Sequence, residues 1–108
     1  MGQKGSSRIL IYSHDTFGLG HLRRCRVIAH HLVEQNKHLT VLILSGSPII
    51  GSFDFRSRVD FVRVPGVIKL RNGEYTSLSL HMDIEDTLML RSSIIKQTAG
   101  IIDPDVVI

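Results

Sequence analysis

Cysteine, aromatic residues and long apolar stretches are all scarce in this chain of 108 residues. Its single cysteine, Cys25, cannot form an internal disulfide, and a lone thiol is typical of a reducing compartment. No apolar run approaches the roughly 20 residues that a membrane-spanning helix needs, and none is long enough for the core of a signal peptide. These absences predict a cytoplasmic protein without a membrane span.

Aromatic residues make up only 6% of the chain, and tryptophan is absent. The net charge is +3, but the 13 lysines and arginines are dispersed and form no basic stripe. Nucleic-acid binding through stacked bases and a basic surface is therefore not expected. A hydrophobic content of 43% is sufficient for one compact domain, which is small for an enzyme with two substrates.

Short apolar runs and one helical period alternate in the first half of the chain. Arg8 to Ser13 and Leu39 to Leu44 are expected to be buried parallel strands, and Gly20 to about Gln35 is expected to be the helix between them. Strand, helix and strand form a right-handed crossover unit. We therefore predict an α/β, Rossmann-like domain over residues 8–108, with a mostly parallel sheet flanked by helices, after a flexible leader at 1–7.

The second half repeats this alternation less regularly. Val59 to Val64 is predicted to be a strand, and the polar stretch from Lys69 to His81 a long loop. A second helix is expected to begin at Asp83 and stop at Gly100, before a strand at Val106 to Ile108. Because the sequence stops inside an apolar strand, we expect it to be the front part of a larger protein. The apolar side expected for the second helix comprises Ile84, Leu88, Ile95 and Ala99.

The first helix is expected to pack on the sheet through one apolar face. Cys25 lies on that face, so a packing role is favoured over a nucleophilic one. The residues expected on this face are Leu22, Cys25, Ile28, Ala29, Leu32 and Val33.

The turn that leads into this helix has the character of an anion site. Gly18 and Gly20 let a ligand approach the backbone, and the first-turn N–H groups and helix dipole favour negative charge. Arg23, Arg24 and Arg26 are unfavourable so close to a helix start unless an anion is present. An alternative is that these arginines are solvated or are paired with Asp15 or Glu34.

Several common phosphate and metal sites do not fit this turn. Arg23 stands where a dinucleotide-binding loop needs a third small residue, and no Gly-Lys-Ser or Gly-Lys-Thr is present. The neighbouring His30 and His31 diverge on a helix, and His14 with His21 lacks a third ligand. We therefore expect neither a cofactor nor a metal.

The sequence Gly-Leu-Gly-His-Leu-Arg-Arg resembles the N-terminal loop of GT-B glycosyltransferases, particularly the group that includes the peptidoglycan N-acetylglucosaminyltransferase. It also resembles the Gly-His-x-x-Arg loop of nucleotide-sugar hydrolases of pseudaminic acid synthesis, with Gly20, His21 and Arg24 as the matching residues. The Leu-Ser-Gly at Leu44 to Gly46 and the Asp-Pro-Asp-Val-Val-Ile at Asp103 to Ile108 extend the likeness. The stretch from Ser13 to Val67 is similar to a "predicted glycosyltransferase" group of this superfamily.

The resemblance implies a GT-B N-terminal domain that binds a hydroxyl acceptor, while a C-terminal domain binds most of the nucleotide-sugar donor. His21 would be the general base, without a metal, and Gly18, Gly20 and Arg24 would bind substrate. A neutral imidazole at a helix start can accept a proton from a hydroxyl or water. The alternative is that His21 only caps the turn.

Loop position alone suggests that Ser45 and Gly46 line the acceptor side, together with Asn72 to Tyr75. These loops are equally well explained as simple connections. Two other functions remain open: a nucleotide-sugar hydrolase of the same fold, with water as acceptor, and a non-catalytic anion-binding module. We expect the isolated chain to be inactive and to self-associate through an open sheet edge.

Overall fold

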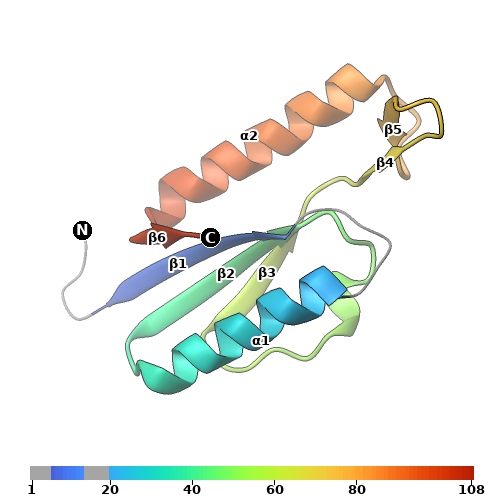
Figure 1. Ribbon diagram of the computed structural model, residues 1–108. Helices are drawn as coiled ribbons and strands as arrows, with labels where there is room; N and C mark the ends of the chain where they lie inside the picture. The colour runs from blue at the N-terminus through green and yellow to red at the C-terminus, as the bar shows by residue number, and fades with distance from the viewer. Residues whose placement is uncertain (1–5, 14–19) are drawn as a thin grey trace.

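The computed structural model describes residues 6–13 and 20–108. Two long helices and six strands make up these segments (Figure 1). In order they are β1 (Ser7–Ser13), α1 (Gly20–Gln35), β2 (Leu39–Ser45), the 3-10 turn η1 (Ile50–Ser52), β3 (Val59–Arg63), β4 (Val67–Lys69), β5 (Tyr75–Ser77), α2 (Ile84–Ile102) and β6 (Val106–Val107). The first strand thus includes Ser7, which had been assigned to the leader, whereas residues 1–5 lie outside the described range.

Four strands form a parallel sheet in the order β3-β2-β1-β6. Strands β1 and β2 pair over their whole length, from Ser7 opposite Leu39 to Ser13 opposite Ser45. Helix α1 covers one face of the sheet and α2 the other (Figure 1). Right-handed crossovers require this arrangement, because β2 and β6 lie on opposite sides of β1. The α/β, Rossmann-like prediction is confirmed.

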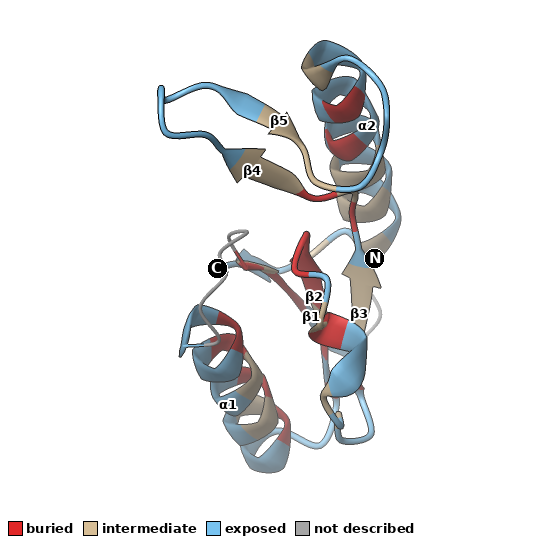
Figure 2. Cartoon of the chain, turned by 90° about the vertical axis from the view of Figure 1, so that its right-hand side faces the viewer, coloured by how far each residue is buried: buried red, intermediate tan, exposed pale blue. Residues whose placement is uncertain are grey.

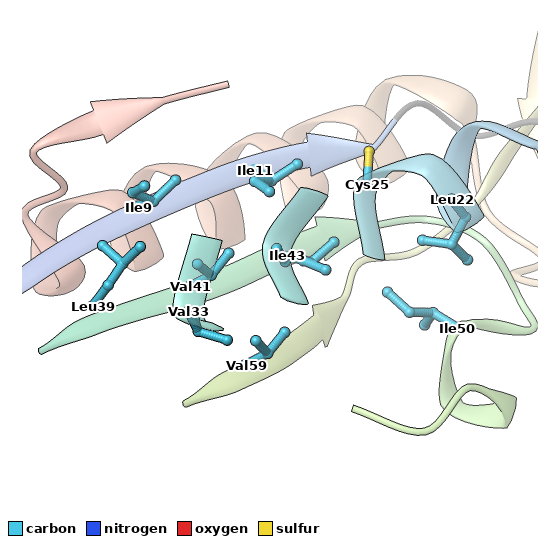
Figure 3. Packing of buried hydrophobic residues seen from close by; sticks show 11 residues of the cluster. Ile9, Ile11, Leu22, Cys25, Val33, Leu39, Val41, Ile43, Ile50 and Val59 are labelled. Carbon is cyan, nitrogen blue, oxygen red and sulfur yellow. The ribbon is translucent and has the colours of Figure 1, made fainter. Parts of the chain in front are cut away.

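The main core lies between α1 and the sheet (Figure 3). Cys25 is buried there, as expected for a packing residue, and each large aliphatic side chain buried in this layer contributes about 1.5–3 kcal/mol. Ile28 is exposed, contrary to prediction, because the helical rotation of about 100° per residue turns it away from the line through Cys25 and Ala29. The buried apolar residues of α1 are Leu22, Cys25, Ala29 and Val33, with Leu32 half-buried.

The carboxyl end of α1 is capped by a residue from the segment before β3. Arg58 donates side-chain hydrogen bonds to the carbonyls of Val33 (2.7 Å), Asn36 (2.6 Å) and Leu39 (2.9 Å). Helix α1 has no basic residue in its own last turn, so Arg58 supplies the cation that the helix dipole favours there. Its backbone has a φ of 73°, a left-handed conformation that is uncommon for an arginine.

The expected loop from Lys69 to His81 contains most of a hairpin. Strands β4 and β5 pair antiparallel, with Val67 opposite Ser77 and Lys69 opposite Tyr75. Gly73 has a φ of 89° in the turn, and the Asn72 side chain accepts a hydrogen bond from the Glu74 N–H (3.0 Å). Each strand has only three residues, which is too short for sequence alternation to predict.

Helix α2 begins after Asp83, as predicted, but continues past Gly100 to Ile102. A glycine inside a helix costs only about 1 kcal/mol, so the stop comes instead at Asp103, whose φ is 47°, followed by Pro104. The residues predicted to lie on the packed side of α2 also differ from those observed. Leu88 is exposed, and the buried residues of α2 are Thr87 and Arg91. Exposed and intermediate residues make up most of α2 in Figure 2, with buried residues over a small part of its length.

No helix within residues 6–13 and 20–108 combines the length and the apolar character that crossing a membrane requires.

Candidate functional site

The candidate site lies at the carboxyl end of the parallel sheet. Strands β1 and β2 end there in register at Ser13 and Ser45, and the first turn of α1 lies at the same end (Figure 1). In open parallel sheets, ligands bind beyond the carboxyl ends of the strands. The residues at 14–19 between β1 and α1, including the predicted ligand Gly18, lie outside the described part of the chain, as do His14 and Asp15.

His21 is exposed in the first turn of α1. Its Nε2 lies 4.0 Å from the Sγ of Cys25, one turn further along the helix. This weak contact uses Nε2, so Nδ1 is the ring nitrogen that can meet a ligand. If Nε2 carries the proton and donates it to the thiol, Nδ1 is the basic nitrogen of a neutral ring. The arrangement thus permits a general base at Nδ1.

Two of the three arginines near the helix start, Arg23 and Arg24, are exposed. The first turn of α1 contains no acidic residue, and a Cβ added at Gly20 would meet no atom of the described residues within 4 Å. The backbone at the start of α1 is therefore open to approach by a ligand. Unpaired first-turn N–H groups and nearby guanidinium groups are together suited to an anion.

Arg26 instead packs against the segment before β3. Its Nε donates to the carbonyl of Asp54 (2.6 Å), and its guanidinium lies 5.8 Å from the centre of the Phe53 ring. Glu34, which had been considered as a partner for the helix arginines, forms an ion pair with Arg56. Arg26 is therefore a packing residue, whereas Arg24 remains accessible.

Ser45 and Gly46 are both buried at the end of β2. The Ser45 hydroxyl accepts a hydrogen bond from the Ser47 N–H (3.0 Å), and the Ser45 carbonyl accepts one from the Val64 N–H (2.9 Å). The Gly46 carbonyl lies 2.9 Å from where a Cβ would stand at Gly66. These contacts join β2 to the segment after β3, and a substrate-binding role for the two residues stays a prediction.

Ser13 is a site residue that sequence reasoning did not single out. Its hydroxyl is fully buried and has no hydrogen-bond partner among the described residues. Ser13 follows Ile9 and Ile11 at every second position of β1, so its side chain lies on the same face of the sheet as theirs, the face that α1 covers. An unsatisfied buried hydroxyl costs about 1–3 kcal/mol, so a ligand or water oxygen at this point would stabilise the fold. The available signal was a small polar residue at the last position of an apolar strand.

Asn72 to Tyr75, expected on the acceptor side, form the turn and the start of the second strand in the β4–β5 hairpin. Figures 1 and 2 both show this hairpin on the α2 side of the sheet, whereas α1 lies on the other side. Gly20, His21 and Arg24 are thus grouped on one helical turn, and the Asn72 segment belongs to the opposite layer.

In the described segments, no three histidine, cysteine or acidic side chains are grouped closely enough to hold a metal ion. Comparison of the chain with models of known protein families, with curated proteins and with solved structures finds no match in any of the three.

Proposed function

We propose that this chain is the acceptor-side part of a GT-B glycosyltransferase, which transfers a sugar from a nucleotide-sugar donor to a hydroxyl acceptor. The observation that carries the proposal is the exposed His21 in the open first turn of α1, beyond the carboxyl end of a Rossmann-like parallel sheet. The buried hydroxyl of Ser13 lies at the same end and has no hydrogen-bond partner among residues 6–13 and 20–108, which supports a ligand there. The likeness of the Gly20, His21 and Arg24 pattern to the family's loop supplies the reaction class.

In the proposed reaction, His21 accepts the proton of the acceptor hydroxyl as its oxygen attacks the anomeric carbon. The bond from that carbon to the diphosphate breaks, and the nucleoside diphosphate leaves with the electron pair. The N–H groups at the start of α1 and the accessible Arg24 offset the charge that develops on the diphosphate. A second domain, implied by the family resemblance, supplies most of the donor contacts.

Replacement of His21 in the full-length protein tests the base assignment. We expect His21→Ala to lower kcat by about 10²–10⁴-fold, the usual contribution of a general base, while the KM for the donor changes little. His31→Ala, an exposed histidine three turns further along α1, is the matched control and should retain activity. Unchanged turnover in His21→Ala would remove the assignment.

Product analysis with a panel of nucleotide sugars separates the transferase from a hydrolase of the same fold. We expect sugar release to depend on an added hydroxyl acceptor. Free sugar formed at the same rate without any acceptor would identify water as the acceptor and exclude the transferase.

Thermal unfolding of the chain with nucleoside diphosphates distinguishes catalysis from simple anion binding. We expect the full-length protein to be stabilised and the 108-residue chain to be unaffected. Stabilisation of the chain alone would favour a non-catalytic anion-binding module.

We expect the protein to be located in the cytoplasm, because its one cysteine is a free, buried thiol.

A further inference from the structure

A cavity lies on the opposite side of the sheet from His21. It has a volume of about 390 Å³, is open to solvent and is lined by residues of α2, the β4–β5 hairpin and the carboxyl end of β1. Figure 2 shows the hairpin and α2 side by side above the sheet. Its volume is within the range of small-molecule sites. The residues that define its character are Tyr12, Val67, Tyr75, Leu88, Arg91 and Ile95.

Arg91 places a buried cation at this cavity. Its side chain is only 7% exposed, and it donates to the Pro65 carbonyl (2.6 Å) and to the Tyr12 hydroxyl oxygen (2.6 Å). Transfer of a guanidinium from water into a protein costs several kcal/mol, and an apolar residue would serve packing at least as well. The hydrogen bonds to Pro65 and Tyr12 hold this positive charge beside the cavity.

Tyr12 complements this cation with a directed donor. Because its hydroxyl oxygen accepts a hydrogen bond from Arg91, the hydroxyl hydrogen points away from the guanidinium and can be donated to another acceptor. Tyr12 itself lines the cavity. An O–H donor beside a guanidinium favours an anionic acceptor, because hydrogen bonds to charged groups are roughly twice as strong as neutral ones.

The remaining walls are mostly apolar, with Ser92 as one further polar lining residue. Val67, Leu88 and Ile95 contribute aliphatic surface, and the half-exposed ring of Tyr75 lies on β5 at the hairpin side. Such walls suit a flat apolar body, which can pack against the tyrosine rings. A ligand complementary to both parts has an aromatic body and one carboxylate.

We propose that this cavity binds a small aromatic carboxylate, whose carboxylate accepts the hydrogen bond of Tyr12 beside Arg91 while its ring lies against Val67, Tyr75 and Leu88. The site is independent of the proposed glycosyl transfer, because it uses neither α1 nor the end of β2. It is a binding function on the α2 side of the sheet.

The test uses 2-naphthoate as the probe and 2-naphthamide as a neutral ligand of the same shape. Each is titrated into the ¹⁵N-labelled full chain, and amide shifts are followed by NMR. We expect naphthoate to bind about ten-fold more tightly than the amide, with the largest shifts at Tyr12, Val67 and Leu88. Equal affinities, no saturable binding, or shifts concentrated at the exposed Met89 and Ile101 would overturn the proposal.

Two matched substitutions locate the contact. Tyr12→Phe removes the inner hydroxyl and should weaken naphthoate binding about ten-fold, whereas Tyr75→Phe removes a hydroxyl from the hairpin wall and should leave binding unchanged. Leu88→Trp, at an exposed position of the same wall, should block the cavity even if Tyr12→Phe fails to fold. Undiminished binding in Leu88→Trp would place the probe elsewhere and reject the cavity.

Discussion

His30 lies where α1 meets the segment before β3. The Nε2 of His30 accepts a hydrogen bond from the backbone N–H of Arg56 (3.2 Å). Its ring packs edge-on against the Phe55 ring, with a centroid distance of 6.2 Å. Partial burial lowers the pKa of His30 below 6.5, and the positive charges of Arg26 and Arg56 lower this pKa further. Acceptance of the Arg56 hydrogen bond also requires an unprotonated Nε2, which agrees with the lowered pKa.

Folding stability should therefore depend on pH through His30. The folded pKa is lower than that of the unfolded chain, so the unfolded chain binds the proton first as pH falls. The stability contributed by neutral His30 is complete above about pH 6.5 and is lost as pH drops through the folded pKa. We expect urea unfolding to show a smaller loss of stability between about pH 7.5 and 5.5 in His30→Gln than in the unmodified chain.

His31 provides the control for this comparison, because it is exposed on the same helix. His31→Gln should retain the pH dependence of the unmodified chain. An equal loss of stability in His30→Gln and the unmodified chain would show that other groups dominate the acid response.

Arg58 is expected to be a stabilising residue despite its left-handed backbone. Arg58→Ala removes three hydrogen bonds, to the last turn of α1, to the turn after it and to the start of β2, and keeps the unfavourable φ, so we expect a loss of about 2 kcal/mol. Arg58→Gly removes the same bonds but relieves the backbone, so its loss should be about 1 kcal/mol smaller. Urea unfolding measures both, and an alanine variant as stable as the original would contradict the capping role.

Among the helices and strands, the same substitution should change the stability in opposite directions at two glycines, Gly100 in α2 and Gly66 just before the hairpin. Gly100 is an exposed residue inside α2, and an added Cβ would meet nothing within 4 Å. Gly100→Ala should therefore raise stability by about 0.5–1 kcal/mol. At Gly66, an added Cβ would lie 2.9 Å from both the Gly46 carbonyl oxygen and the Leu78 Cδ2.

Gly66→Ala should destabilise the fold by about 1–3 kcal/mol, because the Gly46 backbone cannot move without disturbing the end of β2. Thermal unfolding measures the melting temperatures of both variants, with Gly100→Ala as the control at a position that has space for an added Cβ. Similar melting temperatures for the two variants would mean that the Gly46 and Gly66 backbones separate readily.

Elements with a long local pattern were predicted well, and short or polar ones were not. Helix α1 and strands β1, β2 and β3 follow apolar runs that suffice to locate them. Strands β4 and β5 are held by pairing with each other and by the hydrogen bond between the Ser77 and Thr87 hydroxyls, which ties the hairpin to α2. Such pairing leaves no periodic signal in a three-residue segment.

At the scale of the whole molecule, the edge of the sheet at β6 is expected to mediate self-association. Val106, Val107 and Ile108 are exposed and apolar, and among the described strands β6 pairs only with β1. Edge strands without charged residues readily pair with other chains. Size-exclusion chromatography with light scattering should show concentration-dependent association of the 108-residue chain, reduced in Val107→Lys.

Val27→Lys is the control for the added charge, since Val27 on α1 is 63% exposed and Val107 is 64% exposed. It should leave association unchanged. A monomer at all concentrations, or equal reduction by both variants, would exclude the β6 edge as the contact.

Local sequence patterns were sufficient to predict the α/β class, the position of α1 and the grouping of Gly20, His21 and Arg24 at its start. These features depend on contiguous residues, whose spacing alone fixes which of them share a turn or a face. The surroundings of buried polar groups emerged only in the folded chain: Ser13 is buried with no hydrogen-bond partner in the described part of the chain, and Arg91 donates to Tyr12, 79 residues earlier. The burial of a polar group depends on partners distant in the chain, and no local pattern reports them.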